Sequence, residues 1–92
     1  MANSTTYFMG QESSKTFVEY RLIRQGSDLL IIISGGAAHI GSIAYSDKLN
    51  TQKFHQFTYR GHRENAIVTQ TINALAEFIE GEVLVLAGIH YD

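Results

Sequence analysis

The stretch ENAIVTQTINALAEFI, residues 64–79, decides how the rest of the chain is interpreted. Its apolar residues recur every three or four positions: Val68, Ile72, Leu75 and Ile79, with Ile67, Thr71, Ala76 and Phe78 widening the stripe. This spacing is typical of an α-helix that buries one face. Gly81 follows at the place where a left-handed C-cap is expected. We therefore predict one long helix over residues 64–79.

On both sides of this helix the sequence changes to the patterns of β-strands. The expected strands are residues 16–24, 29–33, 40–45, 53–59 and 83–89. The first alternates apolar and polar residues, as a strand with one wet face does. The second is apolar throughout, which is typical of a central strand covered on both faces. Gly26 lies in the turn between these two and is available for a positive φ.

These elements predict an α+β fold, namely a two-layer sandwich with one long helix packed on one face of a mainly antiparallel sheet of about five strands. The short connections favour antiparallel pairing of the first four strands in sequence order. Residues 1–15 are polar and are expected to form a flexible N-terminal segment, and residues 16–92 a single α+β domain. The second sheet face needs a cover, and a second copy of the chain would supply one, so a homodimer is expected.

Composition excludes several function classes. The 92 residues contain no cysteine, which rules out disulfides, thiol catalysis and cysteine-ligated metals. The net charge is −2 and the basic residues form no stripe, so no nucleic-acid partner is expected. The longest purely apolar run, Leu29–Ile33, is far shorter than a membrane span. We expect a cytoplasmic protein without a membrane partner.

Three short segments that combine glycine with histidine stand at the ends of the predicted elements. They are Gly35-Gly36-Ala37-Ala38-His39-Ile40-Gly41, Gly61-His62-Arg63-Glu64 and Gly88-Ile89-His90-Tyr91-Asp92. Loops at the ends of elements are where binding sites are built, and glycine lets a backbone approach a ligand closely. The candidate binding residues in the first segment are Gly35, Gly36, His39 and Gly41, and His90 is the candidate in the third.

Two chemistries fit these segments. His39, His62 and His90 could hold a divalent metal, with Glu64 or Asp92 completing the shell, because imidazole is a common metal ligand. No helical spacing brings these histidines together, so separate surface histidines are the alternative.

The second chemistry is anion binding. Arg60, Gly61, His62 and Arg63 directly precede the helix, whose N-terminus offers free N–H groups to a phosphate. The alternative is that these arginines are solvated or pair with Glu64.

Aromatic residues in and after the strands are a further candidate surface. Those that could stack on a planar ligand are Tyr45, Phe54, Phe57, Tyr59 and Tyr91. Strands favour aromatic residues anyway, so a role in the core or in a dimer interface is the alternative.

The three glycine–histidine segments, in this order and with one helix after the second, resemble the small prenylated-flavin chaperone family, the D component of gallate-type hydroxyarylic acid decarboxylase systems. The resemblance implies a non-catalytic protein that binds reduced prenylated FMN (prFMN) and assists its delivery to a UbiD-like decarboxylase. A flavin prenyltransferase, which makes the cofactor, is the other implied protein partner.

Combined with the residue analysis, the resemblance implies a flavin site that involves Tyr45 or Tyr91 as an aromatic wall and the helix N-terminus as the phosphate site. Its cargo would be prenylated FMN or ordinary FMN, with a divalent metal as a possible addition. Two alternatives remain open. One is a small metal-dependent enzyme that uses His39, His62 and His90 with Glu64 as base. The other is a structural subunit of a decarboxylase complex.

Overall fold

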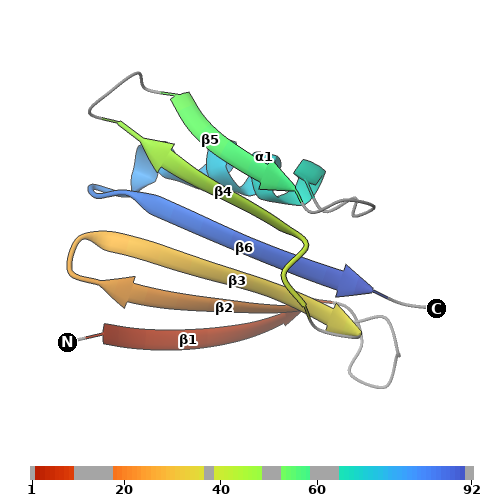
Figure 1. The fold of residues 1–92 in the computed structure, drawn as a ribbon. Helices are drawn as coiled ribbons and strands as arrows, with labels where there is room; N and C mark the ends of the chain where they lie inside the picture. Colours follow the sequence, from red (N-terminus) through yellow and green to blue (C-terminus); the bar gives the residue numbers. More distant parts are fainter. Residues whose placement is uncertain (1, 10–17, 37–38, 49–52, 59–64, 91–92) are drawn as a thin grey trace.

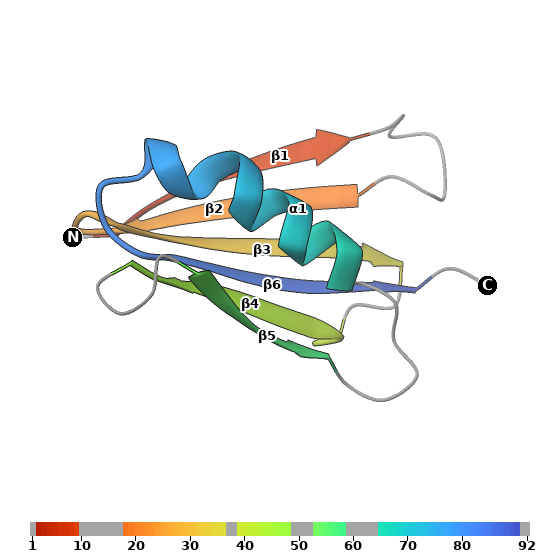
Figure 2. The ribbon, with the colours of Figure 1, turned by 90° about the horizontal axis from the view of Figure 1, so that it is seen from above.

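The computed structural model describes residues 2–9, 18–36, 39–48, 53–58 and 65–90. Its elements, in chain order, are β1 (Ala2–Met9), β2 (Val18–Gln25), β3 (Asp28–Gly36), β4 (Ser42–Asp47), β5 (Lys53–Thr58), α1 (Asn65–Leu75), the short 3-10 helix η1 (Ala76–Phe78) and β6 (Val83–His90). The strands form a single sheet and α1 lies across one of its faces (Figures 1 and 2). The predicted α+β class with a mainly antiparallel sheet is confirmed.

The order of strands differs from the predicted one. The six-stranded sheet has the order β1-β2-β3-β6-β4-β5, so that β6 lies between β3 and β4 (Figure 1). The pair β3–β6 is parallel and the other pairs are antiparallel. The expected pairing of the second and third predicted strands is therefore wrong. The physical reason is that β6 reads VLVLAGIH, an almost wholly apolar strand that gains most by having neighbours on both sides.

Strand β1 lies in the segment for which the sequence predicted no regular element. It pairs with β2 over eight residue pairs, from Ala2 opposite Gln25 to Met9 opposite Val18. Its sequence, ANSTTYFM, contains threonine and aromatic residues that suit a strand. It carries no regular apolar alternation, and it lies at the edge of the sheet. Periodicity therefore gave no signal for it.

The helix ends earlier than predicted. After Leu75 the chain tightens into η1, and the cap residue Ile79 is already extended, with φ −105° and ψ 129°. A 3-10 turn has three residues per turn rather than 3.6, so it shifts side chains off the helical stripe. Phe78, which we expected to widen the buried stripe, is 75% exposed as a result.

Gly81 does not have the predicted left-handed C-cap role, since the positive-φ glycines of the described chain are Gly26 (φ 61°) and Gly36 (φ 64°). Gly81 is instead a point of close approach. Its N–H donates to the carbonyl of Ser27 at 2.9 Å, and a Cβ at this position would run into Ser27 and the Asp28 carboxylate.

We expect Gly81→Ala to lower the free energy of unfolding by about 1 kcal/mol, because the exposed β2–β3 turn has to shift to admit the methyl group. Urea denaturation of the variant and the parent chain measures this. Glu80→Ala, at the exposed neighbouring position, is the control and should change little. An unchanged midpoint for Gly81→Ala would contradict the close contact.

The hydrophobic core lies between the sheet and α1. Its buried members are Ile31, Ile33, Ala44, Val68, Ile72, Val83, Val85 and Ala87. Val68 and Ile72 confirm the face predicted for the helix, and the strand members come from β3, β4 and β6. Figure 2 shows that α1 covers only this face of the sheet. No helix in the described part of the chain has the length and apolar character needed to cross a membrane.

Candidate functional site

The parallel pair β3–β6 brings the first and third glycine–histidine segments together. Parallel strands end at the same edge of a sheet, and here Gly35 lies opposite Ile89 and Gly36 opposite His90. The residues of each pair are 54 positions apart in the sequence, and their proximity depends wholly on the insertion of β6 beside β3. We call this edge, with His39–Gly41 beside it, the glycine–histidine end of the sheet.

Residues 39–41, which lead into β4, cross over β6 at this end (Figure 1). A Cβ built on Gly88 would collide with the carbonyl group of His39, so the backbone of His39 lies directly on Gly88. The N–H of Gly41 then donates to the carbonyl of Ala87 at 2.8 Å. Gly88 and Gly41 are both buried, and His39 is half-buried. The glycine of the third segment therefore makes room for the chain's own backbone.

The N-terminus of α1 lies at the same end of the sheet. In Figure 2 the helix runs antiparallel to β6, so that its first turn is near the end of β6. None of the described residues in the first turn of α1 is acidic, and the N–H groups of this turn form the positive end of the helix dipole. The predicted anion residues Arg60, Gly61, His62, Arg63 and Glu64 directly precede Asn65 and lie outside the described residues.

Tyr45 lies elsewhere on its own chain. It pairs with Leu84, whereas Gly88 is four residues further along β6, about 13 Å away at the usual rise of a strand. Within one chain, Tyr45 is therefore not brought to the glycine–histidine end.

The predicted metal ligands are only partly described. His39 lies over Gly88. His90 is the last residue of β6, but its side chain is outside the described part of the structure. The whole of His62 is outside it as well. Within the described ranges, no three His, Asp or Glu side chains form a group that could hold a metal ion. The metal site thus stays a prediction.

The matching family model is decisive for identity. The model of the prenylated flavin chaperone LpdD-like domain matches residues 12–92, which include all three glycine–histidine segments. The chain belongs to this family.

The fold of this LpdD-like domain is similar to that of a solved protein with a very different sequence. A chain from the crystal structure of a chaperone complex for yeast 20S proteasome assembly superposes with a TM-score of 0.61 at 6% sequence identity. The match covers 96% of the LpdD-like chain and 76% of the yeast chain. At this identity the likeness shows a shared fold. No curated protein matches the sequence.

The described residues of the LpdD-like domain fit a flavin mononucleotide in two respects. The helix N-terminus supplies N–H donors for a phosphate, and the glycine–histidine end supplies backbone groups near two histidine positions. Gly36 has a φ of 64° and is exposed, so the chain turns there without a side chain between it and a ligand.

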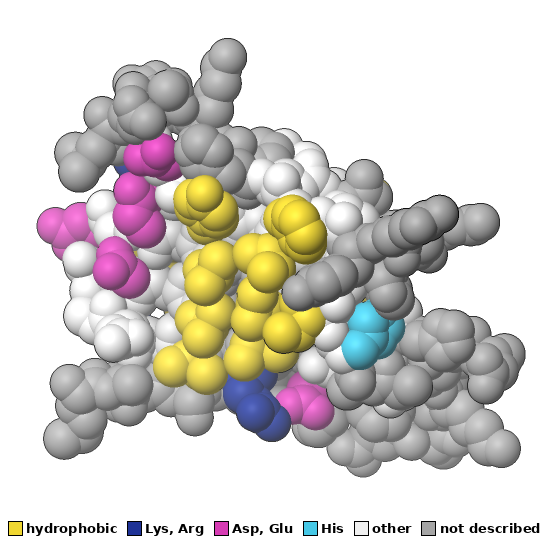
Figure 3. Space-filling model, viewed as in Figure 1, with side chains coloured by type: hydrophobic (Ala, Val, Ile, Leu, Met, Phe, Trp, Pro, Cys, Tyr) yellow, Lys and Arg dark blue, Asp and Glu magenta, His cyan; other side chains and the backbone are white. Residues whose placement is uncertain are grey.

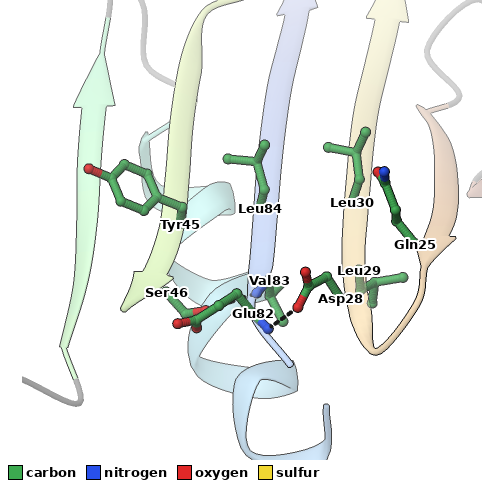
Figure 4. Close-up of a pocket in the computed structure, with 9 residues that line it drawn as sticks. All are labelled: Gln25, Asp28, Leu29, Leu30, Tyr45, Ser46, Glu82, Val83 and Leu84. Carbon is green, nitrogen blue, oxygen red and sulfur yellow. Dashed lines mark hydrogen bonds between the residues drawn. The ribbon is translucent and has the colours of Figure 1, made fainter. Parts of the chain in front are cut away.

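Sequence reasoning missed a hollow at the other end of the LpdD-like sheet. It has a volume of about 560 Å³ and lies on the face opposite α1. Figure 4 shows Leu30, Leu84 and Tyr45 side by side on β3, β6 and β4, with the carboxylates of Asp28 and Glu82 below them. The hollow escaped prediction because its floor joins strands whose order the sequence did not reveal.

The carboxylates beside this hollow are tied into the structure. The Ser46 hydroxyl donates to Glu82 Oε1 at 2.6 Å and accepts a hydrogen bond from the Val83 N–H at 2.8 Å. The Glu82 N–H donates to Asp28 Oδ1 at 2.8 Å, and the Lys48 N–H donates to Glu82 Oε2 at 3.1 Å. These bonds join the start of β6 to the β2–β3 turn and to the end of β4, so both acids have a structural role.

Proposed function

We propose that this LpdD-like domain binds reduced prFMN at the glycine–histidine end of its sheet and carries it, without catalysing a reaction on it, to a UbiD-like decarboxylase. The observation that carries the proposal is the juxtaposition of two family segments by the β3–β6 pair, beside the start of α1. We further propose that the chain acts as a homodimer and receives its cargo from a flavin prenyltransferase.

The chemistry of the segments supports this role. A flavin phosphate carries two negative charges and suits the positive end of the helix dipole at the start of α1, where Arg60 and Arg63 would add charge-assisted hydrogen bonds. The ring system needs backbone or imidazole donors along its polar edge, and Gly35, Gly36, His39 and His90 are the candidates. A carrier must release its cargo, and an open edge of a sheet permits faster release than an enclosed cavity.

The experiment that tests the proposal is an anaerobic titration of the purified chain with reduced prFMN, with FMN as the comparison ligand. Absorbance and native mass are recorded together. Stoichiometric binding that prefers the prenylated form, followed by activation of an apo-decarboxylase by the loaded chain, is the expected result. No binding of either flavin would overturn the proposal.

Arg63→Ala and His62→Ala should each weaken prFMN binding by about tenfold, because each removes one charge-assisted donor from the phosphate site. The anaerobic titration measures the change in Kd. Arg24→Ala removes the same charge from an exposed position at the other end of the sheet and is the matched control. Unchanged titration curves for both site variants would refute the assignment of the phosphate site to the residues that directly precede α1.

One observation favours the metal alternative enough to test it in parallel. At the crossover, the backbone of His39 lies on Gly88, and His90 is two residues further along β6. Metal analysis of the purified chain, before and after chelation, distinguishes the two accounts. A stoichiometric metal in a protein that binds no flavin would favour the metal-dependent enzyme over the carrier.

A further inference from the structure

A groove runs along one flank of α1, on the face of the sheet that carries the helix. It has a volume of about 410 Å³ and lies between the helix and the strands β2 and β3. In Figure 2, α1 lies obliquely over the sheet, and the parts of β1 and β2 near the glycine–histidine end lie beside the helix rather than under it. This α1 groove has a floor of Tyr20, Leu22 and Ile31 and a wall of Ile67, Thr71 and Ala74.

The groove exists because the sheet is wider than one helix. Five spacings of about 4.8 Å separate the edge strands β1 and β5, which gives a width of about 24 Å, whereas a helix with its side chains is about 10 Å across. The buried core residues of the sheet come from β3, β4 and β6. Tyr20 and Leu22 of β2 pack at the margin of this core and stay half-buried. The sheet therefore has room for one further helix beside α1.

The helix wall of the groove suits close contact with another helix. Ile67, Thr71 and Ala74 are four and three positions apart, so they form one row along α1. Two of the three are small, which allows a second helix axis to lie at the usual 8–10 Å. The Thr71 hydroxyl donates to the carbonyl of Ile67 at 2.7 Å. It therefore has an acceptor within its own helix and needs none from a partner.

The elements on either side of the groove carry no charge. Neither α1 (NAIVTQTINAL) nor β1 (ANSTTYFM) contains Asp, Glu, Lys or Arg, although 17% of the whole chain is charged. The solvent side of a surface helix is commonly charged, whereas the exposed residues of α1 include Ala66, Gln70, Asn73 and Ala74. Charged residues are depleted from the centre of protein interfaces. The composition therefore indicates a protein partner on this flank.

Charge at one end of the groove selects the direction of such a partner. Most acidic side chains of the described chain gather at the end of the sheet remote from the glycine–histidine end, at the left of Figure 3. Glu77 and Glu80 directly follow α1 at this end and are exposed, and Arg24 on β2 offsets only part of their charge. A helix antiparallel to α1 would begin beside these carboxylates, which favour the positive end of its dipole. A parallel helix would place its negative end there.

We propose that the α1 groove docks one amphipathic helix of the client decarboxylase, antiparallel to α1. The inference rests on the proposed function for the identity of this client. The first turn of α1 lies at the glycine–histidine end, so the groove leads the client toward the cargo. A strip as long as α1, about 16 Å, and one helix wide buries less than about 1,200 Å² in total. Interfaces of this size are transient, as delivery requires.

Two neighbouring residues of α1 give a matched test. Ala74 lines the groove and Asn73 does not, and both are exposed. Anaerobic biolayer interferometry measures the affinity of the loaded and the unloaded chain for a purified UbiD-like apo-decarboxylase. We expect Ala74→Glu to raise the Kd at least about tenfold, because it buries an unpaired carboxylate, and Asn73→Glu to change it less than about twofold. The titration with prFMN should be the same for both variants, since neither touches the cargo site.

Cross-linking identifies the occupant, since the chain has no cysteine of its own. A benzophenone is attached to the thiol of Ala74→Cys before the variant is mixed with the apo-decarboxylase. After irradiation, mass spectrometry of the linked peptide gives its sequence. We expect a peptide that is helical in the decarboxylase and has apolar residues every three or four positions. A link to a strand or a loop would overturn the inference.

The outcomes separate this inference from the proposed function. A loaded chain that binds the decarboxylase with the same Kd in the parent and both glutamate variants would refute the docking surface and leave the carrier role intact. A chain that binds no flavin but docks through Ala74 would refute the carrier and support the docking surface, as in a structural subunit. A chain that binds prFMN and no decarboxylase would overturn the inference.

Discussion

Gly88→Ala is expected to lower the free energy of unfolding by about 3 kcal/mol and the melting temperature by about 15 °C. The new methyl group would occupy the position of the His39 carbonyl, which belongs to the backbone and cannot turn aside as a side chain would. Either the crossover lifts from β6 or the strand bends. Both movements break the hydrogen bond from the Gly41 N–H to Ala87.

The same substitution tests the site, because the crossover carries His39. We expect Gly88→Ala to weaken prFMN binding even at temperatures where the variant is folded. Differential scanning calorimetry and the anaerobic titration measure the two effects. Gly26→Ala is the matched control, since Gly26 has a φ of 61° but open space around its Cβ position. It should cost about 1 kcal/mol through backbone strain alone and leave binding unchanged. Equal stability of the two variants would contradict the close crossing at Gly88.

The second large effect is expected for Ser46→Ala, which should lower the free energy of unfolding by about 2 kcal/mol. Ser46 is 7% exposed, and its hydroxyl bridges the Val83 N–H and the Glu82 carboxylate. Its removal leaves the N–H of the fully buried Val83 without an acceptor and takes one donor from a charged group. Unsatisfied buried groups and charged hydrogen bonds are the costly cases.

Ser42→Ala provides a close control for Ser46→Ala. Ser42 is on the same strand and fully buried, but its hydroxyl donates to the neutral hydroxyl of Thr58 at 3.1 Å. We expect this variant to cost less than about 1 kcal/mol. Urea denaturation of both variants measures the difference. A Ser42→Ala variant as unstable as Ser46→Ala would show that the hydrogen bonds of Ser46 to Glu82 and Val83 stabilise the fold no more than the neutral hydrogen bond of Ser42 does.

Local patterns predicted the elements of this fold better than their arrangement. The helical stripe of Val68 and Ile72 and the apolar runs of β3 and β6 were recognisable because burial imposes their period. The spacing of apolar residues within one element does not indicate which strands are neighbours in the sheet. The position of β6 depends on the competition of whole strands for the centre of the sheet, and that competition involves residues far apart in the sequence.

The candidate site shows the same limit. The three glycine–histidine segments were identifiable, and the structure brings the first and third together. Gly88 was interpreted as a residue that lets a ligand approach, whereas the atoms that approach it belong to His39. A glycine in a sequence signals that something comes close, but it does not say whether a ligand or the chain does so. The hollow beside Tyr45 had no local signal, since the residues that line it come mainly from four strands, β2, β3, β4 and β6.

The central place of β6 also governs when the molecule can form during synthesis. β2 and β3 can pair as a hairpin early, and so can β4 and β5. Within the sheet, the two hairpins have no common neighbour until β6 pairs with β3 and β4. Such long-range pairing is slow to nucleate. The sheet is therefore completed only when β6, which follows both hairpins and α1 in the chain, takes its place between them.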